Sequence, residues 1–282
     1  MTDEAEPAHE VPSTEELEIF FARSLGEIVR DAAATQQVRA ALDAAEAGSV
    51  RAASRDADGQ WRAHPWVKQV VLSAFSLSEL TAYPQWPGGA VDKSLVPARR
   101  MEVADGVRVV PGGTSVRRGA HLGDGVVIMP PSYVNVGAWV GAGTMVDSHV
   151  LVGSCAQVGR GVHLSAAVQL GGVLEPVGAR PVVVEDHVFV GAQCGLYEGV
   201  VVREGAVLAP GVTLTASTTI HDLVHERTLR GEVPAGAVVV PGTRPARGDY
   251  ASAQGLSLYA PCIVKYRDDD TSAAVVLEDA LR

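Results

Sequence analysis

The sequence has 282 residues, a formal net charge of −10 and a hydrophobic content of 47%. This length allows one to three domains with an ample core, and the acidic balance excludes nucleic acids and anionic membranes as main partners. The start MTDEAEPAHE lacks the pattern of a secretory signal, no apolar run is long enough to span a membrane, and the three cysteines form no CxxC pair, so we expect a cytoplasmic protein without a cysteine zinc site.

Helical patterns fill most of the region before residue 106. Residues 1–12 are expected to lack regular structure, and Ser13 with Glu16 then has the spacing of a capping box. The apolar residues that follow predict one helix with the face Leu17, Phe21, Leu25 and Ile28. The pattern further predicts, in chain order, a helix that ends near Gly48, a hairpin over 50–63, a helix that opens at Pro65 and a linker over 76–105.

The dominant pattern is a six-residue period between residues 110 and 220. An aliphatic residue recurs at every sixth position, first as Val110, Val116, Leu122, Ile128, Val134, Val140, Val146, Val152, Val158, Leu164 and Leu170. After a pause the period resumes in a new frame as Val184, Val190, Leu196, Val202, Leu208, Leu214 and Ile220. Gly, Asn or Asp often follows these positions directly.

A period of six fits neither an α-helix nor a simple strand. It fits a chain that runs straight for a few residues, turns a corner and repeats, so that each hexad is one side of a three-sided coil. The aliphatic side chain then points inward, and the Gly, Asn or Asp after it is expected to supply the turn geometry. The pattern therefore predicts a mainly β protein, built as a parallel β-helix of about six coils.

The period is interrupted once, between Leu170 and Val184. Residues 171–183 form a loop that we expect to be exposed to solvent and functional. Residues 221–232 look irregular, and 233–242 are predicted to add a last coil or capping strand. We therefore expect three parts: an N-terminal helical domain with its linker (1–105), the β-helix (106–243), and a small C-terminal β segment with an acidic tail that ends in a short helix (244–282).

Two segments carry a specific resemblance. MPPSYVNVGAWVGAGTMVDSHVLVGSCAQVGRGVHLS (129–165) and GGVLEPVGARPVVVEDHVFVGA (171–192) resemble the tetrahydrodipicolinate N-succinyltransferase family, hexapeptide-repeat enzymes of lysine and diaminopimelate synthesis. DGQWRAHPWVKQVVLSAF (58–75), VRVVPGG (107–113) and SLYAPCIVK (257–265) are similar to other parts of that family. The resemblance implies a left-handed β-helix and a homotrimer with its sites between subunits.

The resemblance also implies the reaction of a CoA-dependent N-acyltransferase. The amine of hydrated or ring-opened tetrahydrodipicolinate attacks the thioester of succinyl-CoA, which gives N-succinyl-2-amino-6-oxopimelate and CoA. A site for this reaction must remove a proton from the amine, hold two carboxylates and stabilise an oxyanion. No metal is expected.

Four residues carry the implied chemistry. Arg108 matches a substrate-binding arginine that would clamp a carboxylate, although by position alone it is a surface arginine at a domain junction. Asp147 matches a substrate-binding and catalytic aspartate, and Glu198 matches a glutamate that assists as a base. By residue type alone, Asp147 is one more corner residue and Glu198 is an exposed hexad residue. His149 stands where the family shows Trp and is the alternative base.

Lys265 and Ser217 are the implied contacts to CoA. Aspartates at 268–270 follow Lys265 and disfavour phosphates nearby, so Arg180, Arg244 or Arg247 are alternatives. The chain also has Gln193, Cys194 and Gly195 where the family reads Arg-Ser-Glu. These departures leave the acyl donor and the amine acceptor open.

Three other functions remain as hypotheses. A related enzyme of a secondary-metabolite pathway would acylate another amino acid, and the changes at 193–195 favour it. A non-catalytic trimeric scaffold would keep the fold without the site. A metalloenzyme of the γ-carbonic-anhydrase type would need histidines stacked on neighbouring coils, but His121, His149 and His163 do not have the required spacing of 18 residues.

Overall fold

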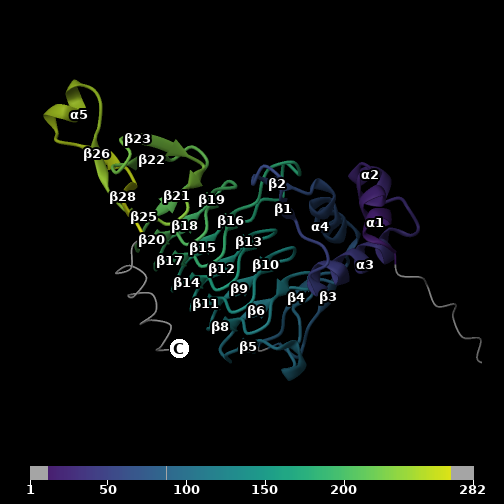
Figure 1. Ribbon diagram of the computed structural model, residues 1–282. Helices are drawn as coiled ribbons and strands as arrows, with labels where there is room; N and C mark the ends of the chain where they lie inside the picture. Colours follow the sequence, from purple (N-terminus) through teal and green to yellow (C-terminus); the bar gives the residue numbers. More distant parts are fainter. Residues whose placement is uncertain (1–11, 87, 268–282) are drawn as a thin grey trace, which may run out of the picture.

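The protein consists of an N-terminal group of helices, a three-faced coil of short strands, and an arm that projects from the far end of the coil (Figure 1). The computed structural model describes residues 12–86 and 88–267. The expectations for residues 1–11 and for the acidic tail with its helix lie outside these residues. In the described part, no helix is long and apolar enough to cross a membrane.

Four helices form the N-terminal part: α1 (Thr14–Phe21), α2 (Leu25–Ile28), α3 (Ala34–Ala47) and α4 (Pro65–Leu77). Ser13 closes the predicted capping box with Glu16. The prediction of a single helix after it is wrong, because Ser24 starts α2 with a second capping box to Glu27. Gly48 ends α3 in the left-handed conformation, with a φ of 85°, as glycine allows without strain.

Two hairpins flank α4. β1 (Ala53–Arg55) and β2 (Trp61–Ala63) pair antiparallel, which confirms the predicted hairpin. β3 (Leu80–Ala82) and β4 (Val91–Lys93) form a second hairpin inside the segment expected to be a linker. Gly88, one of the residues that suggested a linker, lies in the turn between these strands. The linker prediction is therefore wrong for this stretch.

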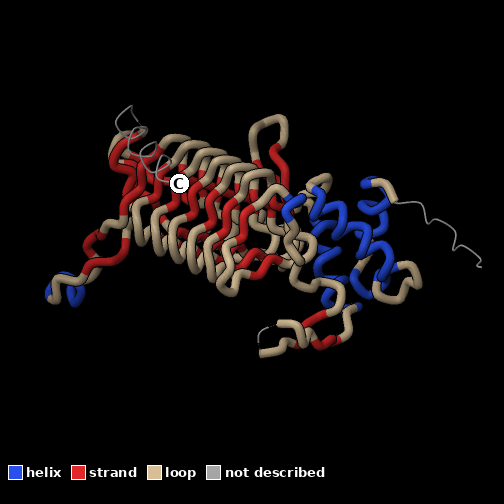
Figure 2. The backbone as a smooth tube through the Cα atoms, turned by 90° about the horizontal axis from the view of Figure 1, so that it is seen from below, coloured by secondary structure: helices blue, strands red, loops and turns tan. Residues whose placement is uncertain are grey.

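Short parallel strands stack on three faces, which we call A, B and C (Figures 1 and 2). Face A contains β24 (Glu232–Val233), β19 (Val201–Val202), β16 (Val183–Val184), β13 (Gln157–Val158), β10 (Trp139–Val140) and β7 (His121–Leu122). Face B contains β25 (Ala237–Val240), β20 (Val207–Leu208), β17 (Phe189–Val190), β14 (His163–Leu164), β11 (Met145–Val146), β8 (Val127–Ile128) and β5 (Arg108–Val109). Face C contains β21 (Thr213–Leu214), β18 (Gly195–Leu196), β15 (Gln169–Leu170), β12 (Leu151–Val152), β9 (Tyr133–Val134) and β6 (Ser115–Val116).

The chain visits the faces in the order A, B, C, so every third strand returns to the same face and pairs in parallel. Val140, for example, pairs with Leu122 below it and with Val158 above it. The aliphatic positions from Ile128 to Ile220 are at most 1% exposed and form one core. Burial of each such side chain contributes about 1.5–3 kcal/mol, so this stack stabilises the coil along its whole length. The predicted three-faced β-helix is confirmed.

The first position of the predicted series is wrong. Val109, not Val110, pairs with Ile128 and packs against the core. The segment from Val109 to Val116 is therefore one residue longer than a hexad, and the extra residue is accommodated in the bend at Gly112. A Cβ on Gly112 would lie 2.6 Å from the side chain of Pro130, so only glycine permits this close approach.

The corners also follow a different rule from the one expected. The left-handed residue lies three places after the aliphatic position, as at Gly143 (φ 68°) and His149 (φ 63°). The glycine directly after the aliphatic residue serves close stacking instead, because a Cβ on Gly141 would lie 2.6 Å from the carbonyl carbon of Gly159. Asp147 holds the position equivalent to Gly141 at the next corner.

The coil does not become irregular after Ile220. Residues 221–232 instead contain most of a hairpin, which joins β22 (Thr219–Asp222) to β23 (Arg227–Arg230), and β24 and β25 then add the predicted last coil. β28 (Cys262–Tyr266) pairs with β25 and β22 at the end of face B. The projecting arm consists of β26 (Thr243–Pro245), α5 (Asp249–Ala253) and β27 (Ser257–Tyr259).

A buried carboxylate ties this end of the coil together. Asp222 is 1% exposed and accepts hydrogen bonds from Nδ1 of His225 (3.0 Å), Nε of Arg227 (3.0 Å) and the hydroxyl of Tyr266 (2.9 Å). Burial alone would raise the pKa of the Asp222 carboxyl, but these hydrogen bonds hold the pKa well below its ordinary value. Ionised Asp222 therefore fastens the β22–β23 hairpin to β28.

We predict that Asp222 makes folding stability sensitive to acid. The pKa of the Asp222 carboxyl is lower in the folded than in the unfolded protein. Its contribution to the free energy of unfolding is therefore complete above about pH 4 and is lost as the pH falls below about 4. Asp222→Asn should be less stable than the parent at neutral pH and should lose less stability on acidification. Urea unfolding at a series of pH values measures both effects, with the exposed neighbour Glu226→Gln as control. An identical acid-induced loss in Asp222→Asn and the parent would contradict this role.

Candidate active site

Arg108 and Asp147 lie on the same side of the coil. Arg108 is an exposed residue of β5, and Asp147 directly follows β11 on face B. β8 lies between these two strands, so their backbones are two strand spacings apart, or about 10 Å. The long side chain of Arg108 can reach across part of this distance. The fold thus brings together two residues that are 39 positions apart in the sequence.

The Asp147 corner is held by its neighbours. The backbone N–H of Asp147 donates to the carbonyl of Leu164, and its own carbonyl accepts a hydrogen bond from the Ser132 hydroxyl at 2.8 Å. Oδ1 accepts from the N–H of Ser148 at 2.7 Å, while Oδ2 has no hydrogen-bond partner within residues 12–86 and 88–267. The half-buried carboxylate is therefore oriented by the backbone and keeps one oxygen available to a ligand.

His149 occupies the same corner as Asp147. Its backbone is left-handed, its N–H donates to the carbonyl of Pro131 at 2.7 Å, and its side chain is exposed. The position is therefore accessible to a bound acceptor, and His149 stays the alternative base.

Glu198 lies at a different corner. It follows β18, where the chain passes from face C to face A, and its exposed side chain stands on a left-handed residue with φ 55°. β18 lies two strand positions from β12 on face C, the strand that follows Asp147. One chain therefore does not bring Glu198 and Asp147 together.

The interrupting loop supports the Glu198 corner. Nε of Arg180 donates to the carbonyl of Gly199 at 2.9 Å, and Nζ of Lys68 in α4 donates to the carbonyl of Ala179. The loop is thus held between α4 and the corner, and Arg180, considered above for CoA phosphates, is engaged in this contact. Burial lowers the pKa of the Arg180 guanidinium.

Lys265 and Ser217 lie at the far end of the coil from Asp147. Lys265 belongs to β28, five strand positions from β11 on face B, or about 24 Å. Ser217 is an exposed residue of the turn after β21, with its hydroxyl 3.1 Å from that of Thr215. These two residues are therefore not in direct contact with the Asp147 corner.

Cys155 is a structural residue. It is fully buried between the coil and the N-terminal helices, and this burial raises the pKa of its thiol to about 12. A thiol that stays protonated is a poor nucleophile. His121 lies on face A, His149 at the corner between faces B and C, and His163 on face B. The described residues contain no group of three or more side chains that could hold a metal ion.

Tyr197 explains the departure at Gly195. The Tyr197 ring lies over β18 and β15, so that a Cβ on Gly195 would be 2.6 Å from the ring and one on Gly171 would be 2.8 Å from it. Gly195 has no positive φ, so its backbone would accept any side chain if the ring were absent. The aromatic ring therefore occupies the space on face C that a side chain at position 195, such as the glutamate that the resemblance implies, would need.

We predict that Gly195 and Tyr197 act as a pair. Gly195→Ala should lower the stability by about 1–3 kcal/mol, because the new methyl group meets the ring. In the double variant with Tyr197→Val this loss should largely disappear. Thermal or urea unfolding of the four proteins in the cycle measures the coupling, and strictly additive losses would show that the ring does not fill this space.

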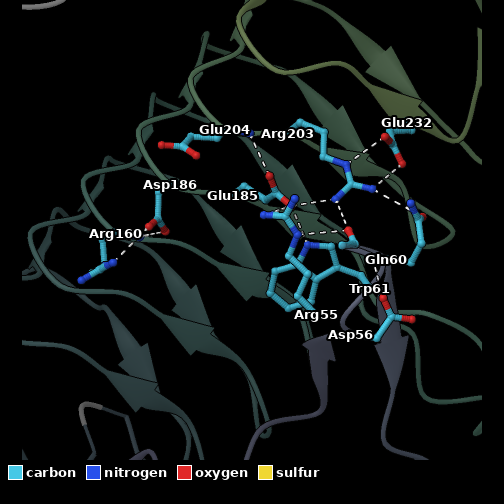
Figure 3. Close-up of polar contacts among 11 residues, drawn as sticks. Arg55, Asp56, Gln60, Trp61, Arg160, Glu185, Asp186, Arg203, Glu204 and Glu232 are labelled. Atoms are coloured by element: carbon cyan, nitrogen blue, oxygen red, sulfur yellow. Dashed lines mark hydrogen bonds and ion pairs between the residues drawn. The ribbon is translucent and has the colours of Figure 1, made fainter.

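A polar network that no sequence pattern indicates joins the N-terminal part to the coil (Figure 3). Arg203 is 7% exposed and forms paired hydrogen bonds of 2.8 and 2.9 Å to Glu232. It also donates to Glu185 at 3.0 Å and to the carbonyl of Gly59 in the β1–β2 hairpin at 2.9 Å. Nε1 of Trp61 donates to Glu185 at 2.7 Å. Loss of one partner from such a buried network costs about 3–5 kcal/mol.

The three-faced coil of six-residue repeats defines the class as the hexapeptide-repeat proteins. Residues 181–216 match the family model "Hexapeptide repeat of succinyl-transferase", and residues 17–77 match "Tetrahydrodipicolinate N-succinyltransferase N-terminal".

Relatives cover nearly the whole chain. The 2,3,4,5-tetrahydropyridine-2,6-dicarboxylate N-succinyltransferase of Afipia carboxidovorans is 43% identical over 260 residues, which is 90% of each chain. The protein of the same name from Polynucleobacter asymbioticus is 46% identical over 253 residues, 87% of this chain and 88% of the relative. The chain therefore belongs to the tetrahydrodipicolinate N-succinyltransferase family, as the resemblance indicated.

One solved structure supports the fold. The N-succinyltransferase structure from Campylobacter jejuni aligns with a TM-score of 0.54 and covers 80% of this chain and 62% of its own. Its sequence identity is 20%, so the similarity concerns the fold alone.

Proposed function

We propose that this protein transfers the succinyl group of succinyl-CoA to the amine of tetrahydrodipicolinate in its hydrated or ring-opened form. The products are N-succinyl-2-amino-6-oxopimelate and free CoA, in the route to diaminopimelate and lysine. The observation that carries the proposal is the family membership, at 43% identity over 90% of both chains. The three free cysteines fit a reducing cytoplasm.

Arg108 and Asp147 are the acceptor residues in this proposal. Arg108 binds one carboxylate of the acceptor through its guanidinium, with the geometry that suits two parallel hydrogen bonds. Asp147 removes a proton from the amine as nitrogen attacks the thioester carbonyl. The tetrahedral intermediate then expels the CoA thiolate, which takes up a proton. The placement of both residues on face B supports this division of roles.

Glu198 enters the site from a second copy of the chain. A single chain carries Asp147 and Glu198 at different corners, so a site that uses both must lie between subunits. A homotrimer with threefold symmetry provides three equivalent sites of this kind. Glu198 then assists the proton transfer opposite Asp147.

CoA extends along the coil from Asp147 toward Lys265 and Ser217. Both residues lie at the end of the coil that carries the arm, where Arg244 and Arg247 are exposed and can meet phosphates. Arg180 is not part of this path, because it holds the Glu198 corner.

A second candidate function is the N-acylation of another amino acid. The observation that favours it is the Tyr197 ring over Gly195, which replaces a charged side chain by a neutral aromatic surface on face C. A panel of amino dicarboxylates tested in the same assay separates the two functions.

Turnover tests the leading proposal. With succinyl-CoA, thiol release should depend on tetrahydrodipicolinate or its surrogate 2-aminopimelate, and Asp147→Asn should lower kcat about 100-fold or more. Asp124→Asn, an exposed aspartate at another corner, is the control and should stay near the parent. Absence of turnover with both acceptors would refute the proposal, and turnover with another amino acid alone would establish the second candidate. CoA binding without turnover of any acceptor would indicate a non-catalytic scaffold.

Mixed oligomers test the position of Glu198. Asp147→Asn and Glu198→Gln should each be nearly inactive alone. Co-expressed in equal amounts, they should recover about one quarter of the parental sites, because a site is intact when an unaltered Asp147 faces an unaltered Glu198 across the interface. Failure of the mixture to exceed either single variant would place both residues in one subunit's site or remove Glu198 from the mechanism.

A further inference from the structure

A cavity of about 560 Å³ lies between the β1–β2 region and face A, on a different side of the coil from Arg108 and Asp147. Its walls include the aromatic rings of Trp61 and Trp139, and Gly141 and Gly159 also line it. None of the residues assigned above to succinyl transfer lines it. The cavity is large enough for an amino acid with its bound water and needs its own explanation.

Arg51 is the central cation of this cavity. Its guanidinium carbon lies 4.1 Å from the centre of the Trp139 ring and 5.5 Å from that of Trp61. Nε of Arg51 donates to the side-chain oxygen of Gln157 at 3.0 Å. Among the residues that the structure describes, the two terminal nitrogens have no acceptor, and no carboxylate lies within 4.0 Å of the guanidinium. Burial lowers the pKa of Arg51 to about 10. A half-buried cation without a counter-ion is stabilised by an anionic ligand.

The remaining charges of the cavity have a definite arrangement. Cations come from the N-terminal side, as Arg51 and Arg55, whereas the corner between faces A and B supplies Asp124, Asp186 and Glu204 together with Arg160. Glu185, the fourth carboxylate, already pairs with Arg203 at 3.0 Å and with Arg55 at 3.9 Å. Two cations thus face a corner that carries three carboxylates and Arg160, so the charges of the cavity are separated between its two sides.

Asp186 is the carboxylate that acts on Arg51. The charge of Asp186 partly offsets the lowering of the Arg51 pKa. Its Oδ1 accepts from the N–H of Arg160 at 2.8 Å, and its Oδ2 has only a long contact of 3.5 Å to the exposed guanidinium of Arg160. This oxygen can therefore accept a hydrogen bond from a cationic ligand group (Figure 3).

We propose that this cavity binds a small zwitterionic amino acid, distinct from the acyl acceptor. The ligand's carboxylate pairs with the terminal nitrogens of Arg51, and its ammonium group meets Asp186. Phosphates and dicarboxylates are repelled by the three corner carboxylates, and polyamines are repelled by the arginines. A bound amino acid would link the N-terminal part to the coil at their junction.

A binding experiment on the intact protein tests this proposal without CoA. The twenty standard L-amino acids are first compared by thermal shift, and the best binder is measured by calorimetry. The same molecule without its amino group, the same molecule without its carboxyl group, and inorganic phosphate are the matched probes. We expect the amino acid to bind and each of the three probes to bind at least about tenfold more weakly.

Variants locate the site. Arg51→Met keeps the packing on Trp139 and should weaken binding about tenfold or more, and Asp186→Asn should weaken it as well. Arg62→Met is the matched control, because Arg62 lies in the hairpin that follows Arg51 but is exposed and paired with Asp56. Asp147→Asn should leave binding unchanged, which distinguishes this cavity from the acceptor site.

The outcomes are distinct. Loss of binding in Asp147→Asn but not in Arg51→Met would place the amino acid in the acceptor site and overturn the proposal, whether or not succinyl transfer occurs. Binding of phosphate or of the deaminated probe with equal affinity would overturn the zwitterionic assignment. If Arg51→Met does not fold, Asp186→Asn decides, because an asparagine there can still accept the hydrogen bond from Arg160. Absence of binding by all twenty amino acids would also overturn it.

Discussion

The stacking of aliphatic side chains on successive coils, as Val140 stacks on Val158, is the constraint on which this protein depends. A substitution such as Leu164→Val would keep an apolar contact in the stack, but a polar residue would not, because each position lies in one continuous core. The stack fixes the height of every strand and the place of every corner. Outer residues such as Arg108 and Asp147 are then positioned by a framework that cannot change locally without disturbing the coils above and below.

The framework is interrupted beside the corner that carries Glu198. The loop over 171–182 leaves the coil, contacts α4 through Lys68 and returns Arg180 to the carbonyl of Gly199, beside Glu198. Tyr197, at the same corner, covers Gly195 and Gly171. A rigid coil with altered corners can therefore vary its chemistry by a few substitutions, while a site that uses corners of different faces requires more than one copy of the chain.

The fold was predictable because its rule is local. A period of six repeats through the sequence, and each hexad adds the same element, so the faces and the core follow from the aliphatic positions. The one-residue shift at Val109 was not predictable, because the close approach of Gly112 to Pro130 belongs to two different coils. The contact of Arg203 with Gly59, 144 residues apart, also leaves no periodic signal. Arg108 and Asp147 are proposed only through resemblance, since their residue types at corners and edges are ordinary.

The central claim is that one chain cannot complete the succinyl-transfer site. The most direct measurement follows specific activity and sedimentation together as the protein is diluted. We predict that activity falls in parallel with dissociation of the oligomer, because separation of the subunits would separate Asp147 from Glu198. Full activity in a sedimenting monomer would contradict it.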